Sequence, residues 1–258
     1  LVNRGDKPVD DWVFLGTRAR SAVLLDPLSD TRAGKAALDH PVPPLARVYL
    51  QLQPGESLVL QTFTDADVNA EPWRYTRPAG EPVAVAGTWT VEFIEGGPVL
   101  PSAFETKEPA SWTTRDDPEA KRFAGTARYT ITFDRPAGDP SDWLLDLGRV
   151  CESARVMVNG KPVGTLLCSP FRVSIGRFLK PGRNTLALEV TNLAANRIAD
   201  LDRRKVDWKY FYDANLASHP DSKQRGVLDA SKWPPFDSGL LGPVRLVPVN
   251  HTDPAAGR

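Results

Sequence analysis

The residues best suited to chemistry gather in one long stretch, from Ala199 to Ser238. Glycosidic bonds are usually cleaved by two carboxyl groups, about 5–5.5 Å apart in retaining enzymes and about 6.5–9.5 Å apart in inverting ones. Nothing in the spacing of the carboxylates of this stretch places two of them across a bond. We therefore interpret them as solvated loop acids: Asp200, Asp202, Asp207 and Asp213.

The same stretch carries large aromatic side chains, which suit two different roles. They are Trp208, Tyr210, Phe211, Tyr212, Trp233 and Phe236. Because Tyr and Trp dominate the contacts between protein surfaces, we favour packing against a neighbouring domain. Direct contact with a sugar stays open as a second role. The residues that would then take part are Trp208, Tyr210, Tyr212 and Trp233 by stacking on a ring, with Arg203 or Asp207 bonded to its hydroxyl groups.

Other motifs for catalysis or metal binding do not occur in the sequence. The 3 histidines lack the spacing of metal ligands. Neither cysteine lies in a C-x-x-C pair, and no serine lies in a G-x-S-x-G motif. Gly96-Gly97 lacks the lysine and the helix of a phosphate-binding loop. Cys151 and Cys168 do not make a disulfide framework, so we predict two free, buried thiols.

Charge and hydropathy argue against nucleic-acid binding and against a membrane span. Lys plus Arg and Asp plus Glu number 32 each, which gives a formal net charge of zero, whereas nucleic-acid binders need a basic stripe. The basic run at 203–205 is flanked by acids, which favours a solvated face. No apolar run reaches the roughly 20 residues of a membrane span. Residues 1–3 read LVN, without an initiator Met or a signal peptide, so we expect a fragment or a processed product.

The elements that must position these residues are strands, most clearly at 153–192. Apolar and polar residues alternate at 155–158, with the period of two of a half-buried strand. Asn159-Gly160 follows, and because both residues tolerate positive φ they predict a tight hairpin turn. Pro181-Gly182 predicts a type II turn. Further alternating segments predict strands at 163–167, 171–175 and 185–190. The pattern indicates an antiparallel sandwich built from hairpins.

Alternation of the same kind, or a short apolar run at 22–25, predicts strands through most of the chain. The segments are 22–25, 48–53, 57–63, 88–93, 126–133 and 143–147. We find no long amphipathic helix and no repeat of fixed period. The residues between Leu28 and Pro44 are mostly polar, small or proline, so we predict a loop there. The stretch from Ala199 to Ser238 is also predicted to be a loop, and loops of such length in compact domains are often functional.

The strand pattern, the chain length and the position of a proline- and glycine-containing linker together predict an all-β protein with two β-sandwich units. A chain of 258 residues suits one large or two ordinary domains. The segment from Arg77 to Pro82 is the best linker candidate, because it places two prolines and a glycine between patterned segments. We therefore predict a first unit at 1–80, a second at 81–250 and a tail at 251–258. Residues 1–4 look like the end of a strand whose start is absent, which would leave a sheet edge open in the first unit.

Several motifs give the chain a family resemblance. V-N-G-K-x-V-G at 158–164, P-F-R-V at 170–173 and L-K-P-G-x-N-T-L-x-L-x-V-T-N at 179–192 resemble the galactose-binding-like jelly roll of the β-galactosidase and β-glucuronidase family. Further matching segments are Y-L-Q-L-Q-P-G-E-S at 49–57, F-A-G-T-A-R-Y at 123–129 and S-G-L-L-G-P-V at 238–244. Together these segments resemble the C-terminal part of the large bacterial α-L-rhamnosidases of glycoside hydrolase family 106.

The resemblance implies a non-catalytic accessory region that supports a catalytic (β/α) barrel, which lies N-terminal to it in that family. It implies hydrolysis of terminal α-L-rhamnose from rhamnose-containing glycans or glycosides by the parent enzyme, in the periplasm or outside the cell. The family's glutamates and its calcium ion belong to the barrel. No position here matches that site, so we assign no catalytic residue and no cofactor to this chain. The alternatives are a free-standing carbohydrate-binding module and a structural scaffold without a ligand.

Overall fold

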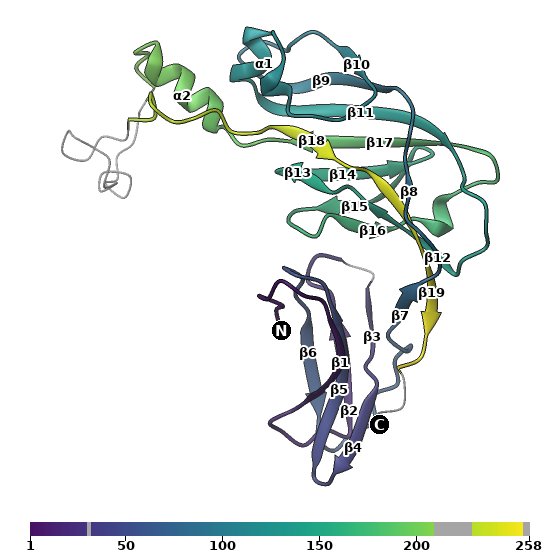
Figure 1. The fold of residues 1–258 in the computed structure, drawn as a ribbon. Coiled ribbons are helices and arrows are strands. Elements are labelled where there is room, and N and C mark those ends of the chain that lie inside the picture. Colours follow the sequence, from purple (N-terminus) through teal and green to yellow (C-terminus); the bar gives the residue numbers. More distant parts are fainter. Residues whose placement is uncertain (30–31, 209–228, 255–258) are drawn as a thin grey trace.

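The computed structural model describes residues 1–29, 32–208 and 229–254 and shows an all-β protein made of antiparallel sheets, which confirms the predicted fold class. Figure 1 shows one group of strands from β1 to β6 and a second group made of most later strands, with β7 and β19 between the two groups. No helix in the described ranges has the length and apolar character that crossing a membrane would require.

The first group contains two three-stranded sheets, ordered β1-β5-β4 and β3-β2-β6. Its strands are β1 (Val9–Phe14), β2 (Ser21–Leu25), β3 (Ala33–Lys35), β4 (Leu38–Val42), β5 (Leu45–Leu52) and β6 (Val59–Phe63). The alternation predicted for 48–53 is confirmed, because Val48, Leu50 and Leu52 are buried. They share one core with Leu24 of β2, so the apolar faces of the two sheets pack together.

The loop predicted between Leu28 and Pro44 is wrong in part, because β3 and β4 lie within it. β3 pairs with β2, and β4 pairs with β5. β4 is an edge strand with a break in its register, a position at which a strand tolerates Pro41. Pairing with neighbouring strands thus decides the structure of segments whose own pattern is weak. At the start of the chain, Val2 forms an isolated antiparallel bridge with Ser57.

The second group is built on a six-stranded sheet, ordered β10-β9-β11-β17-β14-β15, and a five-stranded sheet, ordered β16-β12-β19-β7 with β8 also paired to β19. The strands of the six-stranded sheet are β9 (Trp89–Gly97), β10 (Phe104–Thr106), β11 (Ala124–Asp134), β14 (Ser153–Val158), β15 (Lys161–Leu166) and β17 (Arg183–Thr191). Those of the five-stranded sheet are β7 (Tyr75–Pro78), β8 (Val83–Ala84), β12 (Asp142–Asp146), β16 (Arg172–Ser174) and β19 (Arg245–Thr252). A ribbon joins β13 (Arg149–Cys151) to β18 (Gly239–Gly242).

Short helices complete the second group: η1 (Trp112–Thr114), α1 (Pro118–Arg122), η2 (Gly176–Phe178) and α2 (Ala195–Arg203). The side chain of Asp117 caps α1 by accepting hydrogen bonds from the backbone nitrogens of Glu119 and Ala120, and Pro118 occupies the first helical position. Figure 1 shows α1 and α2 close to one another at one end of the six-stranded sheet.

Burial confirms the alternation predicted for 88–93, 126–133, 143–147, 155–158 and 185–190, whereas no residue of 163–167 is buried. The core between its sheets includes Trp89, Tyr129, Leu145, Val156 and Leu188. The hairpin between β14 and β15 turns at Asn159 and Gly160, whose φ angles are 53° and 75°, as the Asn-Gly signal predicts.

β7 and β19 connect the two groups of strands. The hydroxyl group of Tyr75 in β7 donates to the backbone oxygen of Tyr49 at 3.1 Å, inside the first core, while β7 itself pairs with β19. Arg77 and Pro78, predicted to begin a linker, are the last residues of β7. β19 continues to Thr252, two residues into the predicted tail. The division at residue 80 stays a prediction.

Candidate functional site

The candidate site lies on α2 and on the segment 229–237, within the stretch that the sequence singled out. α2 covers Ala195–Arg203, so the prediction of a loop from Ala199 is wrong for its first residues. Arg197 lies three residues before Asp200, and Arg204 lies four residues after it. Residues at these spacings share one helix face, where opposite charges attract. These ion pairs favour a helix at Ala195–Arg203, and so do the contacts of α2 with α1 and β11.

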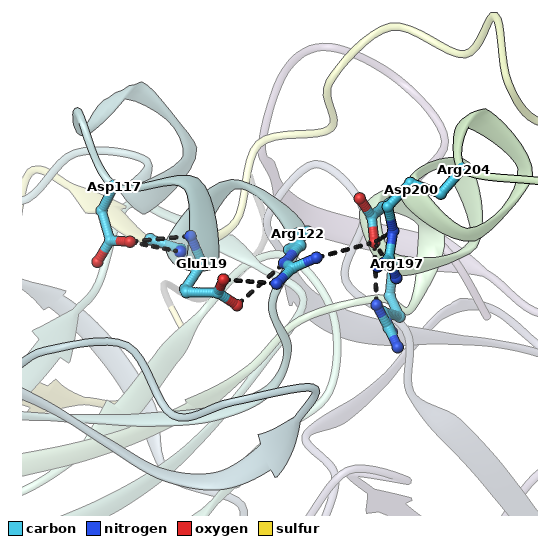
Figure 2. Close-up of polar contacts among 7 residues, drawn as sticks. Asp117, Glu119, Arg122, Arg197, Asp200 and Arg204 are labelled. Atoms are coloured by element: carbon cyan, nitrogen blue, oxygen red, sulfur yellow. Dashed lines mark hydrogen bonds and ion pairs between the residues drawn. The ribbon is translucent and has the colours of Figure 1, made fainter. Parts of the chain in front are cut away.

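Asp200 is bound by arginines from both helices (Figure 2). Its carboxylate lies 2.9 Å from Arg197 and 3.1 Å from Arg204. From α1, Arg122 lies 3.7 Å from the same carboxylate and 2.5 Å from Glu119. The hydrogen bond to Glu119, with a smaller effect of Asp200, raises the pKa of the Arg122 guanidinium. Among these ion pairs, the one between Arg122 and Asp200 joins α1 to α2.

The interpretation of the loop acids as solvated is wrong for Asp200 and Asp202. Only 16% of the Asp200 side chain is exposed. Asp202 accepts a hydrogen bond from the indole nitrogen of Trp208 at 2.7 Å and another from the backbone nitrogen of Ala230 at 2.7 Å. Both carboxylates fix structure, because the folded chain brings donors to them that lie elsewhere in the sequence.

Arg203 connects α2 to the segment that returns to the sheet. Its guanidinium donates to the backbone oxygen of Ser231 at 3.0 Å and to that of Trp233 at 2.9 Å. The half-buried ring of Trp233 lies edge-on to Phe236, with 5.9 Å between ring centroids. Two N–H groups of Arg203 therefore orient the backbone of the 229–237 segment through hydrogen bonds.

A buried polar network anchors this segment to the sandwich. Asn196 of α2 donates to the backbone oxygen of Phe236 at 2.8 Å and accepts from its nitrogen at 2.9 Å. Asn192 donates to the hydroxyl group of Ser238 at 3.0 Å, and the backbone nitrogen of Ser238 donates to Ser111 at 3.0 Å. The sequence alone gave no signal for this network, since its members lie up to 127 residues apart.

Apolar side chains remain exposed around α2. Leu193, just before the helix, is 51% exposed, Val206, just after it, is 41% exposed, and Phe236 is 40% exposed. Because Phe236 is bonded through its backbone to Asn196, it lies near the first turn of α2. The end of the sandwich thus offers apolar contact area beside backbone that is held by hydrogen bonds.

The structure brings three of the predicted site residues to one place. Arg203 and Trp233 are in contact, and Trp208 is joined to them through Asp202 and the 229–233 segment. Asp207 is exposed beside Trp208. Tyr210 and Tyr212, together with Phe211 and Asp213, lie outside the described residues. Contact of these residues with a sugar or with another domain stays a prediction.

Metal and thiol chemistry add nothing to the site. Within the described residues, no group of three or more His, Cys, Asp or Glu side chains could hold a metal ion. That the calcium ion implied by the resemblance lies in a catalytic barrel stays a prediction. Both cysteines are free, as predicted, but the prediction that both are buried is wrong for Cys168, which is exposed. Burial raises the pKa of the Cys151 thiol.

Comparison with known proteins gives two informative similarities, whereas no family model matches the chain. A rhamnosidase structure from Novosphingobium sp. PP1Y is similar over 95% of this chain, with 25% sequence identity and a TM-score of 0.68. A protein of Formosa agariphila named "Putative beta-glucuronidase" is 36% identical over an alignment of 181 residues, which covers 64% of this chain. The predicted resemblance to a sandwich region of glycoside hydrolases is thereby confirmed.

These similarities concern a small part of each relative. The chain covers 22% of the rhamnosidase chain and 16% of the Formosa agariphila protein. The similarity to the rhamnosidase includes nearly all of the present chain, and therefore both groups of strands.

Proposed function

We propose that this chain is a non-catalytic accessory region of an α-L-rhamnosidase-type glycoside hydrolase, and that the α2 end of the sandwich docks onto the catalytic barrel of the same polypeptide. The observation that carries the proposal is the unequal coverage: the chain resembles a rhamnosidase over 95% of its own length but over 22% of that chain. A region of this kind is accompanied by a much longer polypeptide, against which its exposed apolar surfaces can pack.

The chemistry of the α2 end supports docking. Leu193, Val206 and Phe236 offer exposed apolar area, and Trp208 and Trp233 are half-buried aromatic residues of the type that dominates protein interfaces. The ion pairs of Asp200 and the hydrogen bonds of Asp202 and Arg203 hold the backbone around these side chains. Such preorganisation lowers the entropy lost on association.

The remaining properties of the parent follow from the same proposal. It hydrolyses terminal α-L-rhamnose from glycans or glycosides, uses a calcium ion held in the barrel, and works in the periplasm or outside the cell. The jelly-roll character of the second unit belongs to this proposal too. A free-standing carbohydrate-binding module is the alternative, in which Trp208 or Trp233 would stack on a sugar ring.

The first test is the intact mass of the protein in its natural source. A mass far above the 28.3 kDa of this chain is expected, together with hydrolysis of an aryl α-L-rhamnoside by the full-length protein and none by the chain alone. Turnover by the pure chain that is lost on changing Asp207→Asn would overturn the non-catalytic assignment.

The second test addresses docking in the full-length protein. Leu193→Ser and Phe236→Ser change exposed side chains, so we expect the isolated chain to keep its melting temperature while the full-length protein melts earlier. Leu167→Ser is the matched control, because Leu167 is also exposed, at 60%, but lies away from α2. It should change the melting temperature of neither the isolated chain nor the full-length protein. Equal effects of all three variants on the full-length protein would contradict docking at α2.

The alternative is tested with the isolated chain. Saturable shifts of its tryptophan fluorescence on titration with rhamnose-containing oligosaccharides, abolished by Trp233→Ala, would favour a binding module over docking. The docking proposal expects no such shift.

A further inference from the structure

A second feature of the sandwich lies beside η1. It is a cavity of about 220 Å³ between β10 and the segment 106–115. Phe104, Thr106, Glu108, Thr114 and Arg115 line it, together with Ala110, Ser111 and Tyr129. Its volume is below the range of roughly 300–1,000 Å³ that suits drug-sized ligands, so it fits one small ring.

Arg115 is the distinctive group of this cavity. Its guanidinium carbon lies over the Phe104 ring, 3.6 Å from the ring centroid, in a cation–π contact. No carboxylate within the described ranges lies within ion-pair distance of this guanidinium, although most arginines on this sandwich are paired. The half-buried guanidinium of Arg115 is thus fixed at the cavity, and its N–H donors remain available to a ligand.

Acceptor groups also line the cavity. The hydroxyl group of Thr114 donates to the backbone oxygen of Ser111 at 2.8 Å, so its oxygen can still accept. The hydroxyl group of Thr106 donates to the backbone oxygen of Glu108 at 2.7 Å and accepts from the Glu108 nitrogen at 3.3 Å, and the Glu108 carboxylate is exposed. The cavity therefore combines one strong planar donor with several acceptors.

We propose that this cavity binds a sugar unit that carries a carboxylate, a uronic acid, with Arg115 clamping the carboxylate and Thr114 and Glu108 accepting from ring hydroxyl groups. The planar fork of a guanidinium matches a carboxylate with two parallel charge-assisted hydrogen bonds. The acceptors match the hydroxyl groups of a pyranose. The carboxylate follows from Arg115, whereas the choice of a sugar as its carrier rests on the proposed function. The site would let the accessory region hold acidic glycans.

The test is a titration of the full 258-residue chain with D-glucuronate and with D-galacturonate. Binding is monitored through the NMR signal of the Arg115 side chain. D-glucose and D-galactose are the neutral counterparts, and acetate is the bare carboxylate. We expect saturable binding of a uronate, at least tenfold weaker binding of its neutral counterpart and of acetate, and weaker uronate binding at high salt.

Variants assign the binding to this cavity. Arg115→Met should weaken uronate binding at least tenfold, and Arg115→Lys should weaken it less, because the charge remains while the fork is lost. Arg177→Met is the matched control, since Arg177 also lies over a phenylalanine, 4.8 Å from the centroid of Phe178, but not at this cavity. It should leave the affinity unchanged, and unchanged melting temperatures show that each variant is folded.

Several results would overturn the proposal. They are equal affinity for uronate and neutral sugar, acetate binding as tight as uronate, and equal losses in Arg115→Met and Arg177→Met. Binding of neutral sugar that is lost in Glu108→Gln would assign the cavity to uncharged glycans instead. Because these measurements need neither a barrel nor rhamnoside hydrolysis, their failure would leave docking at α2 standing, and failure of docking would not alter them.

Discussion

The carboxylate of Asp202 accepts a hydrogen bond from the indole nitrogen of Trp208 at 2.7 Å, and with its other oxygen it accepts one from the backbone nitrogen of Ala230 at the same distance. Trp208 precedes residues 209–228, and Ala230 follows them. One side chain at the end of α2 thus holds the described residues on both sides of that segment, and the 229–237 segment then continues to the sandwich through Asn196 and Ser238.

Removal of this carboxylate should destabilise the α2 end. Asp202→Ala leaves the indole nitrogen and the nitrogen of the buried Ala230 without their acceptor, and a hydrogen bond to a charged group contributes about 1.5–3 kcal/mol. We expect a loss of that size in the free energy of unfolding, measured with urea. Asp139→Ala, in which a fully exposed carboxylate is removed, is the control and should change stability by less than about 0.5 kcal/mol. Equal losses in both variants would show that Asp202 does not act as a clamp.

Leu188 should be a major core residue of the second group. It is fully buried in β17, between the two sheets, so Leu188→Ala should cost about 2–5 kcal/mol through lost burial and the cavity left behind. Leu193→Ala changes the same residue type at an exposed position and should cost far less. Urea midpoints of the two variants give the comparison, and similar midpoints would mean that the core is assigned wrongly.

The turn at Asn159-Gly160 should depend on backbone conformation and not on space. A Cβ atom at Gly160 would meet nothing within 4 Å, yet the φ of 75° strains any β-branched residue. Gly160→Val should therefore lower the melting temperature. Gly164→Val is matched, because Gly164 lies in the same hairpin with equally open space and without a positive φ, so valine there suits a strand. A larger loss at Gly164 than at Gly160 would refute the role of φ.

Stability in alkali should depend on Tyr49. Its hydroxyl group donates to Asp10 at 2.6 Å, and this bond, with partial burial, raises the tyrosine pKa from 10.0 to about 12. Folded protein then keeps a proton that unfolded protein has released, so this contribution is complete below pH 10 and is lost as the pH rises toward 12. Tyr49→Phe should weaken the decline of the unfolding free energy over that range. Parallel curves for the variant and the parent protein would contradict this linkage.

A comparison of predicted with observed strands and turns shows what the residue pattern of a single segment can predict. In β17, Leu186, Leu188 and Val190 are buried as their alternation predicts, because the pleat of a strand by itself sends alternate side chains to opposite faces. Asn159-Gly160 turns the chain because both residues accept positive φ. In β3 and β4 the pattern failed, because these short segments gain their structure from the strands beside them.

The sequence by itself determined the all-β class, the main strands, the tight turn at Asn159-Gly160, and the resemblance to sandwich regions of glycoside hydrolases. Only the tertiary structure decided the roles of the polar residues. Asp200 and Asp202, expected as solvated acids, bind groups from other segments of the chain, and Arg115 lies over the Phe104 ring at a cavity, without an ion pair within the described residues. The physical reason is range: strand alternation and turns depend on neighbouring residues, whereas the partners of a polar side chain depend on which distant segments the fold brings within hydrogen-bonding distance.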